Sequence, residues 1–509
     1  MRVSVRMLAL GCAAAAPLVL ASACGSDGDA APDPEAVFTA AACPSPNVPG
    51  LPQLDLGAEF SCGTLTVPED RSRPDGRRIE LAVTRLAATS ATPRPDPLVY
   101  LTGGPGGPAL ASAAQVAPLG LNRDRDVLFL GQRGTMHSDP FLACPEIDEF
   151  QAAQTGLSPL DPATAPLDAE ATRTCRDRVA GGGYDLGAYD TTENAADVAD
   201  LRVALGLDEW NVYGVSYGTD LALTVLRDHP DGIRSVVLDS VVPTQNNIIE
   251  GFWPGAAEGF RALFDACAAQ RACAAAYPGL EDEFTATVNR LAAAPLTVDL
   301  SGRRVVLDGY TFANPVIQQS LAPGNYAGLP ALVHATATAT GDGVPAATAL
   351  LGTVTPPGLI GYGLTFGVFC GEQTASTDRG QVAATAKRAL PDFPDAVLSL
   401  VPQAARIFDD CDVWDVPASD TGVHEPTGSA VPTLLLTGSL DAVTPPSQAR
   451  IAAATLSRSE VLEFPGLGHD VLQSSDCAPA VTVGFLEQPT GGYDTSCLTR
   501  VQTPVFTTG

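Results

Sequence analysis

The chain has 509 residues, of which 45% are hydrophobic and 17% charged, so it can bury a large core and is too apolar to be disordered. Its formal net charge of −29 at pH 7 argues against nucleic acid or an anionic membrane surface as a partner, because both would repel it. The single lysine, Lys387, has no glycine-rich loop before it, which excludes a P-loop nucleotide site and disfavours a lysine nucleophile.

Residues 1–24 are expected to be an export signal. Arg2 and Arg6 give it a basic start, and residues 7–20 are apolar but short for a membrane span. Small residues then precede Cys24, which would be lipidated in a lipoprotein, with simple cleavage and free secretion as the alternative. We therefore expect an exported protein, extracellular or in the cell envelope, whose membrane contact is limited to a lipid on Cys24.

Ten cysteines remain once Cys12 and Cys24 of the signal segment are set aside. Export implies an oxidising compartment, in which an even number of cysteines forms disulfides. Pairing of sequence neighbours predicts these bridges: Cys43–Cys62, Cys144–Cys175, Cys267–Cys273, Cys370–Cys411 and Cys477–Cys497. Metal binding is the competing interpretation, and it is disfavoured because no C-x-x-C pair or histidine cluster lies near these residues.

After an Ala-, Pro- and Asp-rich linker at 25–45, strand and helix patterns alternate over residues 46–244. Apolar runs predict strands at 63–67, 79–83, 97–101, 126–130, 210–215 and 235–238. An amphipathic helix is predicted over 193–205, capped by Thr191 or Thr192 and ended by Gly206. This alternation indicates a mostly parallel sheet of βαβ units with helices on both faces.

The alternation stops after about Pro243. Residues 245–365 are rich in Ala, Gly and Pro and have a mainly helical pattern, which predicts a lid inserted between two parts of one sheet. The sheet pattern returns in residues 366–509, with strands at 432–437 and 460–464.

The strand at 210–215 ends in a G-x-S-x-G sequence, Gly214 to Gly218, and an apolar helical pattern follows at once. This is the sequence form of a nucleophile elbow, in which a strand turns sharply into a helix with Ser216 at the apex. The glycines are expected because so tight a turn leaves no room for a Cβ. The pentapeptide alone also fits an ordinary strand-to-helix turn. Together with the sheet pattern and the insertion, it predicts an α/β-hydrolase fold.

A serine hydroxyl becomes a nucleophile when a base takes its proton and a carboxylate orients that base. In α/β-hydrolases the acid and then the histidine follow the serine, on loops at the C-terminal edge of the sheet. Of the five histidines, only His469 follows the last predicted strand. Asp441, after the strand at 432–437, is the predicted acid. Its rival is Asp239, at the end of the strand at 235–238, whose alternative role is to cap a loop or helix.

Acyl transfer develops negative charge on the substrate's carbonyl oxygen, which two backbone N–H groups are expected to bind. One is the N–H of Tyr217, directly after the nucleophile. The other is expected in the glycine-rich loop at 103–107, which follows the strand at 97–101, with Gly104 as the predicted donor. A plain Gly-Pro turn is the alternative interpretation of this loop. The chemistry requires no metal or cofactor.

Taken together, these residues resemble the secreted tripeptidyl-aminopeptidase branch of the proline-iminopeptidase-like α/β-hydrolases, which end in a TAP-like C-terminal segment. The likeness covers nearly everything from about 45 to 500. The matching segments are 103–107, 132–135, 189–194, 214–219, 370–372, 440–446 and 468–469. The resemblance implies a serine exopeptidase that removes short peptides, often tripeptides, from free N-termini. It also makes Glu372 a candidate for binding the substrate amine, with a structural or solvated glutamate as the alternative.

Two residues depart from the family's D-x-R-G-x-G pattern around Arg133: Gly131 stands at the aspartate and Met136 at the last glycine. The missing aspartate removes an expected structural partner of Arg133, which leaves the shape of this loop and the substrate preference open. Two alternative functions also remain. One is an esterase or lipase that uses the same triad, and the other is a catalytically silent, surface-anchored binding protein.

Overall fold

The computed structural model describes most of the chain beyond its first 35 residues. The described ranges are 36–47, 56–321, 325–338, 343–419 and 421–508. The predicted signal segment, Cys24 and residues 25–35 of the predicted linker lie outside them. The end of that predicted linker belongs to the sheet, because strand β1 (Val37–Ala41) pairs antiparallel with β2 (Phe60–Pro68). The expectation that residues 25–45 are all linker is therefore wrong.

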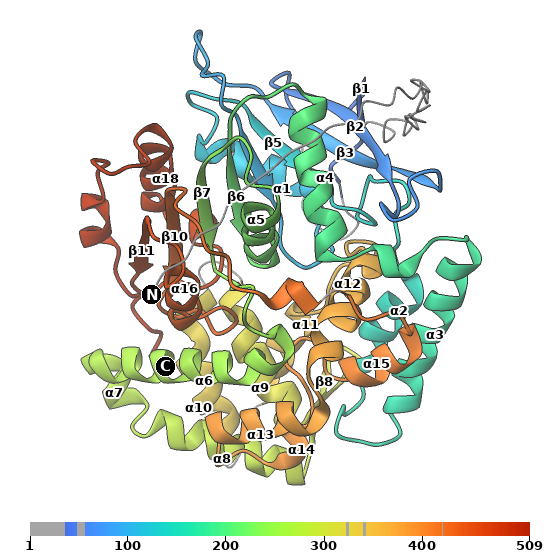
Figure 1. The fold of residues 1–509 in the computed structure, drawn as a ribbon. Coiled ribbons are helices and arrows are strands. Elements are labelled where there is room, and N and C mark those ends of the chain that lie inside the picture. The colour runs from blue at the N-terminus through green and yellow to red at the C-terminus, as the bar shows by residue number, and fades with distance from the viewer. Residues whose placement is uncertain (1–35, 48–55, 322–324, 339–342, 420, 509) are drawn as a thin grey trace, which may run out of the picture.

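One nine-stranded sheet forms the core and occupies the upper part of Figure 1. Its order is β1-β2-β3-β5-β4-β6-β7-β10-β11. The further strands are β3 (Arg78–Leu86), β4 (Leu98–Leu101), β5 (Val127–Leu130), β6 (Trp210–Val215), β7 (Ile233–Asp239), β10 (Thr433–Gly438) and β11 (Ser459–Phe464). The pairs from β5 through β11 are all parallel, and β1, β2 and β3 form an antiparallel edge. The predicted, mostly parallel sheet is confirmed.

The central strands are buried on both faces, which explains why they are continuous apolar runs. In β4, Tyr100 belongs to one hydrophobic cluster and Val99 to the other, because successive side chains point to opposite faces. Helices α1 (Ala109–Val116) and α18 (Cys477–Glu487) cover the Tyr100 face. The other face is covered by α4 (Thr191–Ala204), α5 (Tyr217–Asp228) and α16 (Pro446–Ala453).

Helix α4 begins two residues before its predicted start, and its cap differs from the prediction. The Asp190 side chain accepts a hydrogen bond from the Glu193 N–H at 2.8 Å, so Asp190 is the N-cap in place of Thr191 or Thr192. At the other end Gly206 has φ 64°, the left-handed conformation with which helices commonly end.

A second, mostly helical layer lies below the sheet in Figure 1, and we call it the cap. Its helices between β7 and β10 are α6 (Ile248–Ala269), α7 (Arg271–Ala276), α8 (Leu280–Ala293), α9 (Gly309–Gln318), α10 (Leu329–Ala337), α11 (Val344–Gly352), α12 (Tyr362–Val368), α13 (Arg379–Ala389), α14 (Asp395–Leu398) and α15 (Ile407–Trp414). It also contains a hairpin of β8 (Leu296–Leu300) and β9 (Arg303–Leu307). The short helical segments of the chain are η1 (Ala117–Leu119), η2 (Leu186–Ala188), η3 (Gln319–Leu321), η4 (Asn325–Gly328), η5 (Phe369–Gln373), η6 (Thr374–Ser376), η7 (Thr421–His424) and η8 (Ser496–Arg500).

The insertion extends past residue 365, where the predicted lid ends. Helix α13 packs on α6, and α15 packs on α3 (Ala165–Gly181), so both belong to the cap. Helix α3 and its neighbour α2 (Pro145–Gln154) come from between β5 and α4, so the cap draws on two separate stretches of the chain.

All five predicted disulfides are present. Cys43–Cys62 ties the segment after β1 to β2, and Cys370–Cys411 joins η5 to α15 inside the cap. In the part of the chain that the structure describes, no helix is long and apolar enough to cross a bilayer.

Candidate active site

Ser216 stands at the turn between β6 and α5, at the C-terminal edge of the sheet. Its φ of 58° and ψ of −128° form a conformation that residues other than glycine seldom adopt. A Cβ on Gly214 would overlap the backbone of Gly218, and one on Gly218 would overlap the carbonyl oxygen of Leu101. Both glycines are therefore required for β6, α5 and β4 to approach so closely, and the turn has the geometry of a nucleophile elbow.

His469 follows β11, and Asp441 follows β10. The Nδ1 atom of His469 lies 2.9 Å from Oδ2 of Asp441. The second carboxylate oxygen, Oδ1, accepts the backbone N–H groups of Val443 at 2.8 Å and Thr444 at 2.9 Å. The Thr444 hydroxyl also donates to Oδ2 at 2.7 Å, so the carboxylate that faces the imidazole is held from both sides.

Electrostatics couples these two groups. Burial disfavours the protonated imidazole, but the charge and hydrogen bond of Asp441 outweigh burial and hold the pKa of His469 above its ordinary value. Burial likewise opposes ionisation of Asp441, yet His469 and the hydrogen bonds from Thr444 hold the pKa of Asp441 below its ordinary value. The carboxylate is therefore ionised at neutral pH, ready to stabilise an imidazolium.

Ser216 and His469 line one cavity of about 590 Å³ between the sheet edge and the cap. The cap side of its wall is mainly apolar and includes Phe252, Tyr362 and Phe369. The hydrogen bonds of the described residues do not include one between Ser216 and His469. Nucleophile–base contacts are often longer without substrate than in the reacting complex.

The glycine-rich loop after β4 lies directly against the nucleophile. A Cβ on Gly103 would come within 2.6 Å of the Ser216 Cβ and 3.2 Å of its Oγ, so only a glycine allows this approach. Gly104 and Tyr217 line the same cavity as Ser216. Their backbone N–H groups donate to no acceptor among the described residues, which leaves both free for a substrate oxygen.

Comparison with known proteins places the chain in a family. Residues 96–474 match the alpha/beta hydrolase fold family. The chain belongs to this family. It is 35% identical to tripeptidyl aminopeptidase of Streptomyces lividans over 207 residues, and this aligned stretch makes up 38% of each protein. Over 242 residues it is 28% identical to serine protease Hip1 of Mycobacterium tuberculosis, covering 45% of this chain and 44% of Hip1.

These sequence matches span less than half the length of the relatives. Among solved structures, proline iminopeptidase of Mycobacterium smegmatis is 18% identical, with a TM-score of 0.39 over 84% of this chain and 98% of that one. The predicted α/β-hydrolase fold and the resemblance to the tripeptidyl-aminopeptidase branch are confirmed.

In this α/β-hydrolase the rival acid, Asp239, is occupied elsewhere. Its oxygens accept the Tyr213 hydroxyl at 2.7 Å and the backbone N–H groups of Val471 at 3.0 Å and Leu472 at 2.8 Å. The last two belong to the short helix α17 (Val471–Ser474), so Asp239 binds the start of that helix. The geometry thus favours Asp441 as the partner of His469.

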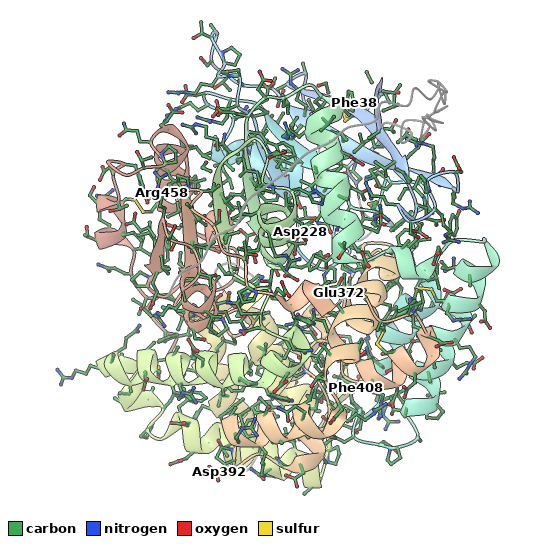
Figure 2. The ribbon with its side chains drawn as sticks, viewed as in Figure 1. Phe38, Asp228, Glu372, Asp392, Phe408 and Arg458 are labelled. Carbon is green, nitrogen blue, oxygen red and sulfur yellow. A yellow bond between two sulfur atoms is a disulfide. The ribbon has the colours of Figure 1, made fainter. Side chains whose placement is uncertain are left out.

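Glu372 lies in η5, close to the junction of cap and core in Figure 2. Its two carboxylate oxygens accept the Thr191 N–H at 2.6 Å and the Thr191 hydroxyl at 2.9 Å, at the start of α4. Burial, with the nearby Asp190 and Asp220, holds the pKa of Glu372 well above its ordinary value. Glu372 is not among the residues that line the cavity. The carboxyl group is used at a helix start, which favours the alternative interpretation of Glu372 as a structural residue.

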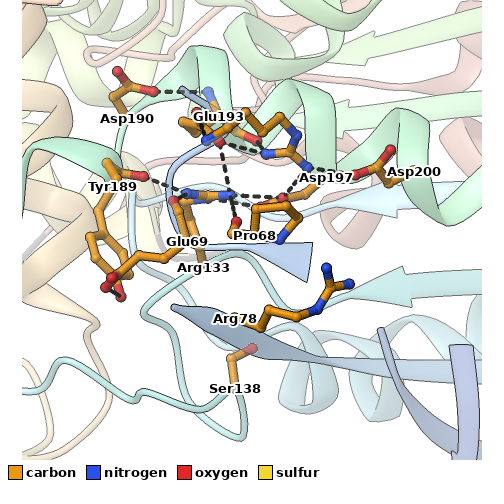
Figure 3. Close-up of polar contacts among 12 residues, drawn as sticks. Pro68, Glu69, Arg78, Arg133, Ser138, Tyr189, Asp190, Glu193, Asp197 and Asp200 are labelled. Carbon is orange, nitrogen blue, oxygen red and sulfur yellow. Dashed lines mark hydrogen bonds and ion pairs between the residues drawn. The ribbon is translucent and has the colours of Figure 1, made fainter. Parts of the chain in front are cut away.

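Arg133 has other partners in place of the aspartate that is missing at position 131. Figure 3 shows its guanidinium against Asp197 of α4, with Nε and Nη2 each 2.8 Å from a carboxylate oxygen. Nη1 also donates to the backbone oxygens of Glu69 and Ala188. A Cβ at position 131 would lie 3.0 Å from Ser138 Oγ and 3.1 Å from the Ala82 oxygen, so a larger side chain has little room there.

A second cavity of about 420 Å³ adjoins the first and shares Tyr362, Thr365 and Phe369 with it. Its wall carries the carboxylates of Asp168 on α3 and Asp410 on α15. Burial raises the pKa of both, and the charge of Asp168 raises that of Asp410 further. No sequence motif marks these residues, and only the packing of α3 on α15 brings them together. Among the described residues, no cluster of His, Cys, Asp and Glu could hold a metal ion.

Proposed function

We propose that this α/β-hydrolase is a serine aminopeptidase that releases short peptides, chiefly tripeptides, from free N-termini through an acyl-enzyme. Ser216 attacks the scissile carbonyl, and His469 takes the serine's proton and gives it to the leaving amine. Asp441 orients His469 and stabilises the imidazolium. The N–H groups of Tyr217 and Gly104 bind the oxyanion. The observation that carries this proposal is the His469–Asp441 pair, 2.9 Å apart, on the cavity that the Ser216 elbow enters.

To recognise the positively charged amine of a free N-terminus, the enzyme needs a carboxylate, which must lie at some distance from the nucleophile. Three extended residues span about 10 Å, so the amine of a tripeptidyl group would lie well away from Ser216. Since Glu372 lines neither cavity, Asp168 and Asp410 in the adjoining cavity are the groups we assign to the amine. Asp410 also accepts the Thr172 hydroxyl at 2.8 Å, and Arg406 lines the same wall. This acidic second cavity favours a peptidase over an esterase, whose substrate has no cation to bind.

We also propose that the protein is exported to the cell envelope or the medium. The predicted signal segment supports this, as do the five disulfides, because such bonds persist in oxidising compartments. The lipid on Cys24 stays a prediction.

The test combines labelling with a substrate pair. A fluorophosphonate probe should label the wild-type protein and leave Ser216→Ala unlabelled. The wild type should hydrolyse a tripeptidyl anilide with a free amine and should lose at least about 100-fold in kcat/KM when that amine is acetylated, the loss expected when a buried charge is left unpaired. Absence of labelling would support a silent binding protein. Rapid p-nitrophenyl ester hydrolysis without any amine requirement would support the esterase.

A further inference from the structure

Two stacked tyrosines at the sheet edge differ in what their hydroxyls bind. Tyr100 of β4 and Tyr213 of β6 have ring centroids 4.9 Å apart and nearly parallel rings. The Tyr213 hydroxyl donates to Asp239. Tyr100 is only 1% exposed and lines the active-site cavity, and its hydroxyl has no hydrogen-bond partner among the residues that the structure describes.

A hydroxyl without a protein partner on a residue that lines the cavity can bind a group of the substrate. Burial, together with the charges of Asp470 and Asp239, raises the pKa of Tyr100, so its hydroxyl keeps its proton. The hydroxyl is therefore a hydrogen-bond donor at the cavity wall, available to whatever the cavity holds.

Asp470 contributes a second polar group to the same wall. It directly follows His469 in the chain and lines the cavity. Its carboxylate accepts the backbone N–H of Gln473 at 3.2 Å and the side-chain amide of the same residue, at the start of α17. Each carboxylate oxygen has more than one lone pair, so these contacts leave Asp470 able to accept a further donor.

The position of His469 determines which part of a substrate lies near the Tyr100 hydroxyl and the Asp470 carboxylate. The imidazole gives its proton to the leaving nitrogen, so the leaving peptide must lie against His469. Asp470 is its neighbour in the chain, and the charge of Asp470 acts on Tyr100. The tripeptidyl group, whose amine we assign to Asp168 and Asp410, would extend in another direction, into the adjoining cavity.

We propose that Tyr100 and Asp470 form a subsite for the first residue of the leaving peptide, an inference that rests on the proposed function. The Tyr100 hydroxyl donates to the carbonyl oxygen of that residue, and Asp470 accepts a hydrogen bond from its departing amine. The ligand class is a peptide that continues beyond the scissile bond. An ester or anilide has no such carbonyl in its leaving group.

The experiment compares two substrates with the same tripeptidyl group, a tetrapeptide amide and an anilide. Tyr100→Phe should lower the ratio of their kcat/KM values, peptide over anilide, by about 3- to 10-fold, the effect of one lost hydrogen bond. Tyr213→Phe is the matched control, because its hydroxyl binds Asp239 in the protein interior and the ratio should not change. The midpoint of thermal unfolding should fall for Tyr213→Phe and not for Tyr100→Phe, which loses no bond within the described protein.

A second measurement does not depend on the amount of active enzyme. An amino-acid amide added to the acyl-enzyme competes with water, and Tyr100→Phe should shift this partition towards hydrolysis. An unchanged ratio and partition in Tyr100→Phe would overturn the subsite, as would an equal loss on both substrates. Failure of the proposed function would be visible in the wild type, which would then hydrolyse neither substrate, and it would overturn both proposals.

Discussion

At the scale of single residues, the pairing of His469 with Asp441 sets the pH range of the proposed reaction. The base must be neutral, and Asp441 holds the pKa of His469 above its ordinary value. We expect kcat/KM to rise with pH through this raised pKa and to level off above it. In Asp441→Asn the largest effect that opposes burial is lost and only the smaller ones of Asp470 and Asp239 remain, so the acid limb should move to lower pH while the plateau falls about 10⁴-fold. A pH profile of kcat/KM checks both effects, and an acid limb that stays in place would contradict this account.

The three proposed catalytic residues should also act as one unit. Ser216→Ala and His469→Ala should each lower kcat about 10⁴-fold or more, and the double variant should be little worse than either single one. The reason is that the base has no function without the nucleophile. Single-turnover kinetics of the three variants test this, and fully additive losses would show that the residues work separately.

The sequence was sufficient to predict the residues of this site that lie in motifs or follow the strand order. Ser216 has its G-x-S-x-G, and Asp441 and His469 come directly after strands. The contact of Glu372 with Thr191 cannot be predicted from the sequence, because it joins residues 181 apart and no local pattern indicates it. Tyr100 was missed for a related reason: in the sequence it is one more apolar residue of a strand, and only the unpaired hydroxyl marks it.

At the scale of elements, the cap directly contacts the catalytic loops. The backbone oxygen of Ser320, in η3, accepts the N–H of His469 at 2.9 Å and the hydroxyl of Tyr326 at 2.6 Å. A Cβ on Gly468 would overlap that tyrosine hydroxyl. The position of His469 therefore depends on the cap as well as on the sheet.

Gly468→Ala tests this dependence. The added methyl group must push the loop or Tyr326 aside, so we expect His469 to move and kcat to fall about 100-fold. Gly428→Ala is the control, because no heavy atom that the structure describes lies within 4 Å of a Cβ there. Steady-state kinetics of both variants measure the fall in kcat, and circular dichroism verifies that both variants are folded. Equal activity in the two variants would mean that the cap does not position the histidine.

Helix α4 is anchored to the antiparallel edge of the sheet through charges. Asp197 is fully buried and binds Arg133 (Figure 3) as well as Arg71. Asp200, one turn on, is 34% exposed and binds Arg71 alone. Asp197→Ala should lower the free energy of unfolding by about 3 kcal/mol, because the buried Arg133 loses its two short contacts with this carboxylate and keeps only Glu193, 3.3 Å away, as a counter-charge. Asp200→Ala should cost under about 1 kcal/mol. Urea unfolding measures both, and similar losses would contradict the assigned difference.

The elements that the sequence did predict are those with a strong burial pattern. β4, β6 and β10 are buried at every position and were found as apolar runs. β1 cannot be told from linker in the sequence, because four of its five residues are exposed and leave no alternation to detect. The predicted cap ends too early, at residue 365. Helices such as α13 bury their apolar face on other cap helices, and their sequence does not indicate whether a helix packs on the cap or on the sheet.

At the scale of the whole molecule, the disulfides differ in whether the elements that they join line the cavities. Cys370–Cys411 spans 41 residues and joins η5 to α15, whose residues Phe369 and Asp410 line the two cavities. Cys267–Cys273 spans 6 residues between α6 and α7, away from both cavities.

Removing each bridge by a double Cys→Ser substitution should separate these roles. Loss of Cys370–Cys411 should cost about 4 kcal/mol of unfolding free energy and loss of Cys267–Cys273 about 2 kcal/mol, because the longer loop gains more chain entropy when it is unfolded and reduced. Only the first variant should also lose kcat/KM on a tripeptidyl anilide, since α15 then no longer holds Asp410 against the cavity. Denaturant unfolding and kinetics on the same preparations give both values. A larger loss of unfolding free energy on removal of Cys267–Cys273 than on removal of Cys370–Cys411 would contradict the first expectation. Full activity in both variants would show that the Cys370–Cys411 bridge does not hold the site in place.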